Sequence, residues 1–191
     1  MDAAQQLILD HGYSGMSVDA LIRSLGLTKG AFFHHFGSKV ELARQLVERY
    51  AEGGVETFQQ MLNRARKQTH DPLQQYLLLI GLYMEQFEGL EKPYEGCLLA
   101  SYIYELQQFD EDMRPVINRE FLHWREELSQ LIREVIKHYP PRVEVNPVAL
   151  ADMFSSTFEG AFILSKSLDE PDITHQQLQL YQQFVRALFQ Q

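Results

Sequence analysis

Apolar side chains recur at intervals of three and four residues along most of the chain, which is the period of an amphipathic helix. Glycines, prolines and capping residues divide this pattern into nine predicted helices. These cover residues 2–11, 17–25, 28–35, 38–67, 72–89, 95–109, 112–139, 147–168 and 173–190. Only residues 143–145 alternate as a strand does, and prolines crowd them on both sides. The pattern therefore predicts an all-α fold.

The first helices are short and closely joined. Gly26 ends the second helix, and Thr28 begins the third only two residues later. Ser17 and Thr28 are both residues that cap helix N-termini, and Ser38 with Glu41 has the spacing of a capping box at the start of a long helix. Two short helices joined by a tight glycine turn indicate a helix-turn-helix.

These elements suggest two domains. We expect a three-helix head over residues 1–47, joined by the long helix to a helical body over residues 48–191. Gly53 and Gly54 lie inside the long helix, and each weakens a helix by about 1 kcal/mol relative to alanine. We therefore expect a bend or break at this pair.

The third helix has the side chains that a DNA groove requires at its start. Residues 28–31 offer one hydroxyl, one cation and two very small side chains, which allow close approach to base edges. Lys29 can donate to guanine, and Thr28 can contact a thymine methyl group or a phosphate. Ser17 and Lys39 begin other helices, where backbone N–H groups favour phosphates.

The charge distribution adds to this interpretation. The chain has 17 Lys and Arg against 26 Asp and Glu, for a net charge of −9. Residues 1–50 are balanced, so residues 51–191 carry the whole excess. An acidic body would repel a polyanion and orient it toward the head.

Several other classes of protein are disfavoured. No apolar run approaches the roughly 20 residues of a membrane span, and the first residues show no basic segment followed by an apolar run. We therefore expect neither a membrane span nor a secretory signal. Cys97 is the only cysteine, so no intrachain disulfide can form. The histidines lack the spacing of a zinc site, and neither a phosphate-binding glycine loop nor a nucleophile elbow occurs. We expect a cytoplasmic protein that is not an enzyme, with no cofactor, metal or membrane partner.

Several motifs of the first 47 residues resemble the DNA-binding domain of the tetracycline-repressor family of bacterial transcription regulators. They are Gly12-Tyr13, Ser17, Gly26-Leu27-Thr28-Lys29-Gly30 and His34-His35-Phe36-Gly37-Ser38-Lys39. The resemblance implies a homodimeric repressor that binds a palindromic DNA operator and is released by a small effector. It assigns DNA contacts to Ser17, Thr28, Lys29, Gly30, Ala31, Phe33, His34 and Lys39.

The head also departs from the family pattern. Phe33 replaces a tyrosine whose hydroxyl commonly reaches a phosphate, and Ile22 stands where many members have alanine. Residues 1–4 align inside the family's first helix, so either the native chain begins upstream or the domain is short. Farther along, residues 96–99 and Glu105 resemble one subgroup of the family.

The body is rich in aromatic residues, which suit either an apolar effector cavity or an ordinary helical core. Cys97 lies near a predicted helix N-terminus, where the helix dipole favours a reactive thiolate. Its modification could release DNA, or it could be a small buried hydrophobe. The candidates for effector binding or sensing are Cys97, Tyr102, Trp124 and Phe158.

The last two helices are apolar enough to pair with a second copy of the chain, and burial inside one copy is the alternative. The predicted dimer contacts are Phe154, Phe158, Phe162, Leu178, Tyr181 and Val185. A dimer is favoured because one short recognition helix contacts too few bases to specify a site.

A helical small-molecule-binding protein without DNA-binding activity is the alternative function. The acidic balance and Phe33 favour it. A steep dependence of DNA affinity on salt would distinguish the two functions.

Overall fold

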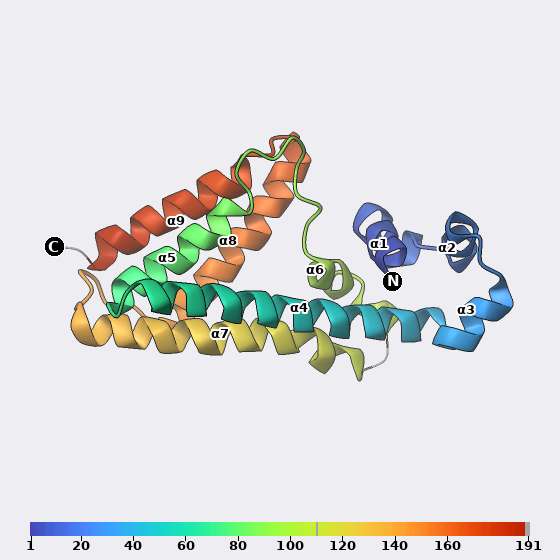
Figure 1. The fold of residues 1–191 in the computed structure, drawn as a ribbon, viewed down its shortest axis with the longest axis horizontal. Helices are drawn as coiled ribbons and strands as arrows, with labels where there is room; N and C mark the ends of the chain where they lie inside the picture. The colour runs from blue at the N-terminus through green and yellow to red at the C-terminus, as the bar shows by residue number, and fades with distance from the viewer. Residues whose placement is uncertain (110, 190–191) are drawn as a thin grey trace. The chain divides into compact units, whose positions relative to one another are not determined.

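The computed structural model describes residues 1–109 and 111–189, and it contains no strand within them (Figure 1). The described helices are α1 (Asp2–Gly15), α2 (Val18–Leu25), α3 (Lys29–Phe36), α4 (Lys39–Gln68), α5 (Pro72–Glu85), α6 (Leu98–Ile103), a 3₁₀ turn η1 (Leu106–Gln108), α7 (Met113–His138), α8 (Pro147–Leu168) and α9 (Ile173–Phe189). The all-α prediction is confirmed. No described helix is both long enough and apolar enough to cross a bilayer.

The chain forms two compact units. Unit 1 comprises Met1–Gly54 and Glu95–Glu120, and unit 2 comprises Val55–Tyr94 and the chain from Phe121 onward. Unit 1 therefore contains α6, a segment that the sequence pattern placed in the body. The helices α4 and α7 each contribute one part to each unit.

Unit 1 packs α1 against both α2 and α6. Its core includes the fully buried side chains of Ile8, Leu42, Leu46 and Tyr102. Tyr13 joins this core, with its ring centroid 5.7 Å from that of Tyr102. Burying aliphatic and aromatic side chains is the main favourable contribution to the stability of such a small bundle.

The helix α1 is interrupted at Gly12. Its backbone has φ 74° and ψ 166°, a conformation that is essentially restricted to glycine. A Cβ atom at this position would lie 2.7 Å from Oε1 of Glu105, so the site also lacks room for a side chain. The regular first helix thus ends where the sequence predicted, and a further short turn reaches Gly15.

The long helix α4 is continuous through Gly53 and Gly54, so the predicted break there is wrong. Buried residues line the helix on both sides of the glycine pair: Leu46, Val47, Ala51, Phe58 and Leu62 are at most 1% exposed. Their packing outweighs the low helix propensity of glycine. Gly54 is also required by close packing, because a Cβ there would lie 2.0 Å from Oε1 of Glu120.

Two helices are shorter than the sequence pattern predicted. The expected helix over 95–109 is reduced to α6 and η1, and the one over 72–89 ends as α5 at Glu85. Glu105 interrupts the first of these with φ −119° and ψ 22°, while its carboxylate binds backbone N–H groups of α1. A tertiary contact therefore overrides local propensity at this point.

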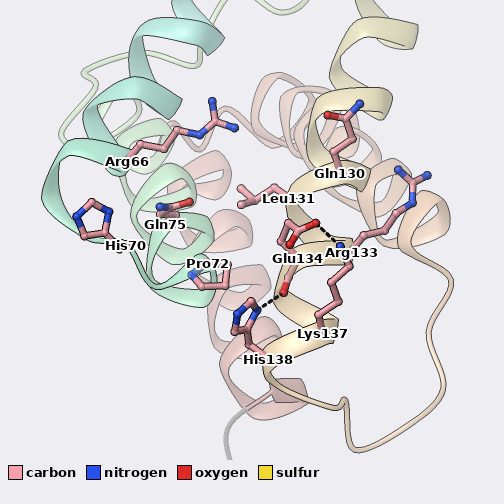
Figure 2. Close-up of a pocket in the computed structure, with 10 residues that line it drawn as sticks. All are labelled: Arg66, His70, Pro72, Gln75, Gln130, Leu131, Arg133, Glu134, Lys137 and His138. Atoms are coloured by element: carbon pink, nitrogen blue, oxygen red, sulfur yellow. Dashed lines mark hydrogen bonds and ion pairs between the residues drawn. The ribbon is translucent and has the colours of Figure 1, made fainter.

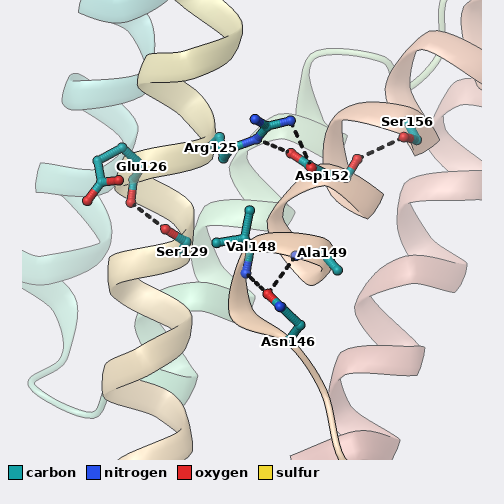
Figure 3. Close-up of polar contacts among 8 residues, drawn as sticks. All are labelled: Arg125, Glu126, Ser129, Asn146, Val148, Ala149, Asp152 and Ser156. Atoms are coloured by element: carbon teal, nitrogen blue, oxygen red, sulfur yellow. Dashed lines mark hydrogen bonds and ion pairs between the residues drawn. The ribbon is translucent and has the colours of Figure 1, made fainter.

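Unit 2 packs α9 against α5 and α8 around an aromatic core. Within it, the Tyr181 hydroxyl donates to the Leu150 carbonyl at 2.9 Å and shares a 2.6 Å hydrogen bond with the Tyr76 hydroxyl. Figure 3 shows a contact between α7 and α8. The Arg125 guanidinium on α7 donates two hydrogen bonds to the Asp152 carboxylate on α8, at 2.7 and 3.0 Å. The Asn146 side chain caps α8.

Candidate nucleic-acid interface

The helices α2 and α3 form the predicted helix-turn-helix. The Ser17 hydroxyl caps α2 by accepting from the Ala20 N–H at 3.0 Å, and the Thr28 hydroxyl caps α3 by accepting from the Ala31 N–H at 3.2 Å. Between them, Gly26 adopts the left-handed conformation that ends a helix sharply. The two caps and the glycine therefore set the turn.

The helix α3 is displayed on the surface of unit 1. Phe32 is the only one of its eight residues that is buried, and it contacts the rings of Phe33 and Phe36. The DNA-contact candidates of this helix and its cap are all exposed: Thr28, Lys29, Gly30, Ala31, Phe33 and His34. Phe33 keeps 48% of its surface accessible, so its ring is open to a partner.

Lys29 supplies the cation at the start of α3. Its Nζ lies 2.9 Å from a carboxylate oxygen of Asp19 on α2, and both side chains are mostly exposed. An exposed ion pair contributes little to stability, so Lys29 can exchange Asp19 for another acceptor at small cost. Ser17 is exposed as well, beside the open N-terminus of α2.

Lys39 is engaged within the protein rather than directed at solvent. Its ammonium donates to the Tyr13 carbonyl at 2.6 Å and lies 4.2 Å from the centroid of the Tyr13 ring. Burial lowers the pKa of Lys39, and the nearby charge of Glu105 partly opposes this shift. In this conformation the ammonium is therefore held by Tyr13, and a phosphate contact by the Lys39 side chain stays a prediction.

Glu105 joins the segment after α6 to the end of α1. One carboxylate oxygen accepts from the Tyr13 N–H at 2.7 Å, and the other accepts from the Ser14 N–H at 2.9 Å and from the Ser14 hydroxyl. Burial opposes ionisation of Glu105, but these hydrogen bonds and the charge of Lys39 outweigh it and lower the pKa of Glu105. The sequence motif included Glu105 without indicating this role.

The four effector candidates fall in both units. In unit 1, Cys97 is half-buried at the N-cap of α6, and Tyr102 is fully buried on that helix. In unit 2, Trp124 and Phe158 lie in one aromatic cluster, with ring centroids 6.0 Å apart. The structure thus places the second pair together in unit 2, with Phe158 buried and Trp124 partly buried.

Buried polar atoms accompany this cluster. Within residues 1–109 and 111–189, no hydrogen-bond partner is found for the buried Nε1 of Trp124 or Nε2 of His123. A buried donor without a partner costs roughly 1–3 kcal/mol. The Trp124 ring packs against Tyr83 and Phe154, so apolar surface surrounds its N–H.

The six residues predicted to form the dimer interface are all buried within a single chain. Each is at most 8% exposed, and Phe154 contacts Tyr181 within unit 2. The apolar period of α8 and α9 identified the faces that pack against their own unit. Other large apolar residues of these helices are exposed: Met153, Ile163, Leu164, Leu168, Leu180 and Phe184.

Fold and site together define a helix-turn-helix DNA-binding protein with a helical body, and comparison with known proteins gives its family. Residues 1–46 match the family model of bacterial regulatory proteins of the tetR family. Residues 77–181 match the model of the tetracyclin repressor-like C-terminal domain. The chain belongs to this family of transcription regulators, which are not enzymes.

Individual relatives agree with this assignment. The chain is 26% identical over 166 residues to the HTH-type transcriptional repressor DhaR of Mycobacterium sp. (strain GP1), covering 87% of this chain and 80% of DhaR. It is 25% identical over 173 residues to the transcriptional regulator AcuR of Cereibacter sphaeroides, covering 91% and 77%. The crystal structure of reduced E. coli NemR has the same fold, with a TM-score of 0.76, 21% identity and coverage of 98% and 93%.

Proposed function

We propose that the protein is a repressor that binds a palindromic operator as a homodimer, in the cytoplasm, and is released by a small effector. The observation that carries this proposal is the exposed start of α3, where one cation and two very small residues stand clear of the unit's core. A helix of this kind can enter the major groove and read base edges.

Dimerisation follows from the limited reach of α3. A single helix of eight residues contacts too few bases to specify one genomic site, so two copies are needed. The helices α8 and α9 pack together, and both carry large exposed apolar side chains, including Ile163, Leu168 and Leu180. We assign the subunit interface to these residues, because large apolar side chains left exposed on packed helices favour contact with a partner.

The effector site is assigned to the aromatic cluster of unit 2. The buried N–H of Trp124 and the ring nitrogen of His123 are polar groups in apolar surroundings, where a ligand carbonyl or hydroxyl could complete their hydrogen bonding. Phe158 would form part of the apolar wall. The effector must bind the DNA-incompetent conformation more tightly for release to occur.

Modification of Cys97 is a second route to release. The residue is half-buried at the N-cap of α6, a helix that packs against α1. An adduct on its sulfur would disturb the start of α6 and, through Glu105, the end of α1. If Cys97→Ser released DNA as readily as wild type on treatment with an electrophile, this route would be excluded.

The main test is titration of the protein against DNA fragments at several salt concentrations. We expect one fragment to bind tightly, with affinity falling steeply as salt rises, because phosphate contacts release counterions. Lys29→Ala should relax the preference among fragments. Lys92→Ala is the matched control, an exposed lysine in the loop after α5. Equal behaviour of both variants and weak, salt-insensitive binding would favour a small-molecule-binding protein without DNA-binding activity.

A further inference from the structure

A polar cleft lies in unit 2 between the end of α4, the start of α5 and the last turns of α7. Its volume is about 510 Å³, which is within the range of small-molecule sites. Figure 2 shows Arg66 and His70 on one side of it, with Glu134, Lys137 and His138 on the α7 side. The aromatic cluster of unit 2 contributes none of its ten lining residues.

The charge of this region is opposite to that of the rest of unit 2. Residues 64–75 and 130–142 together hold six Lys or Arg and only two Asp or Glu. The remaining part of residues 55–94 and 121–189 holds four Lys or Arg and twelve Asp or Glu. The cleft is therefore a basic site within an acidic unit, and it would attract anions locally.

Two of the lining cations are available to a ligand. Glu134 is the only carboxylate that lines the cleft, and its Oε1 pairs with the Lys137 Nζ at 2.6 Å. Hydrogen bonding to Lys137 lowers the pKa of Glu134, so this pair is ionised and close to neutral as a whole. Within the described part of the chain, neither Arg66 nor Arg133 has an ion-pair partner.

Hydrogen bonds fix the base of the cleft. The Gln75 amide donates to the Thr69 carbonyl at 2.9 Å, which orders the connection between α4 and α5. The Tyr139 hydroxyl donates to the Asp71 carboxylate, which also caps α5 by accepting from the Gln74 N–H at 3.0 Å. Asp71 is thus occupied by donors of its own, and it is not among the lining residues.

The histidines add further hydrogen-bonding groups to the lining. The Nδ1 of His138 donates to the Glu134 carbonyl at 2.9 Å, because a carbonyl can only accept. Its other ring nitrogen remains available for a ligand, and His70 lines the facing side of the cleft. Together with the two arginines, these rings place several hydrogen-bonding groups around one cavity.

We infer that this cleft binds a small polyanion, a compound carrying two or more phosphate or carboxylate groups, at a site separate from the aromatic cluster. Arg66 and Arg133 provide the charge, and guanidinium groups suit the planar or forked oxygens of such groups. The size of the cleft and the acidic surroundings select a small compound over an extended nucleic acid, which the rest of the unit would repel.

Isothermal titration calorimetry on the full chain tests this site, with inorganic pyrophosphate and citrate as separate probes and chloride at matched ionic strength as the blank. We expect saturable binding of at least one probe, one per chain, and the two titrations distinguish phosphate from carboxylate recognition. Arg66→Gln and Arg133→Gln should each weaken binding by about tenfold. Arg64→Gln, on the same helix but outside the lining, should leave it unchanged.

A variant that is expected to bind the probe more tightly distinguishes loss of the site from misfolding of the protein. Glu134→Gln removes the only carboxylate of the lining and releases Lys137, so binding should become several-fold tighter. The inference is overturned if neither probe saturates, if Arg64→Gln weakens binding as much as Arg66→Gln does, or if Glu134→Gln does not tighten it. It is also overturned if duplex DNA displaces the probe as readily from the Arg66, Arg133 and Glu134 variants as from the wild-type protein.

Discussion

The recognition helix α3 and the aromatic core of unit 2 are opposites in how they use apolar side chains. In α3 a single residue, Phe32, is buried, and Phe33 beside it remains half exposed. In α8 the buried residues recur mainly at intervals of three and four from Leu150 to Ser165, and Phe154 has no exposed surface. The difference indicates that α3 is shaped for an external partner, whereas α8 holds its unit together.

The largest expected effect comes from removing a ring of the unit 2 core. Phe154 contacts the rings of Tyr83, Phe158 and Tyr181, so Phe154→Ala should lower the free energy of unfolding by about 3–5 kcal/mol. Phe33→Ala is the matched control on α3 and should cost less than about 1 kcal/mol. Denaturant unfolding measures both. Equal losses would show that α3 is packed as tightly as the core.

The next effect concerns the turn that ends α1. Gly12→Ala forces a side chain into a backbone conformation restricted to glycine and toward Glu105, which should cost about 1–3 kcal/mol. Gly53→Ala is the control, because a Cβ there meets no neighbour and the helix should gain up to about 1 kcal/mol. Thermal unfolding should therefore move in opposite directions for the two variants, and a shared direction would contradict the assignment of Gly12.

A smaller effect, with a distinct pH dependence, is expected from Glu105. Folding lowers the pKa of Glu105 below its ordinary value of 4.5, so its stabilisation is complete above that pH and is lost as the pH falls through the folded value. Glu105→Gln should lower stability at neutral pH by about 1 kcal/mol and flatten the fall in acid. Unfolding curves between neutral and acidic pH measure this. An unchanged acid slope would mean that Glu105 does not hold α1.

The sequence predicted what depends on local signals. The caps Ser17 and Thr28 and the turn at Gly26 were all identified from residue type, because capping requires specific side chains at specific positions. The sequence did not predict contacts between distant segments. Neither the Glu105 bonds to α1 nor the position of the Lys39 ammonium over Tyr13 has a local signature.

The dimer residues show a related limit. A helix with apolar residues on more than one face has an inner set of buried apolar residues and an outer set of exposed ones. The three- and four-residue spacing identifies the inner set, because that set is the more regular of the two. Phe154 and Val185 belong to that inner set, while Leu164 and Leu180 belong to the outer one. The basic cleft, in contrast, had a usable signal in the charge excess of residues 64–75 and 130–142.

Hydroxyl-radical footprinting of the bound DNA fragment is the most direct test of the central claim that two copies of α3 read an operator. We expect two protected patches of related, inverted sequence, centred about 34–36 Å apart along the duplex or a multiple of that spacing. Lys29→Ala should remove both patches together. A single patch, or uniform protection that follows total DNA length, would contradict it.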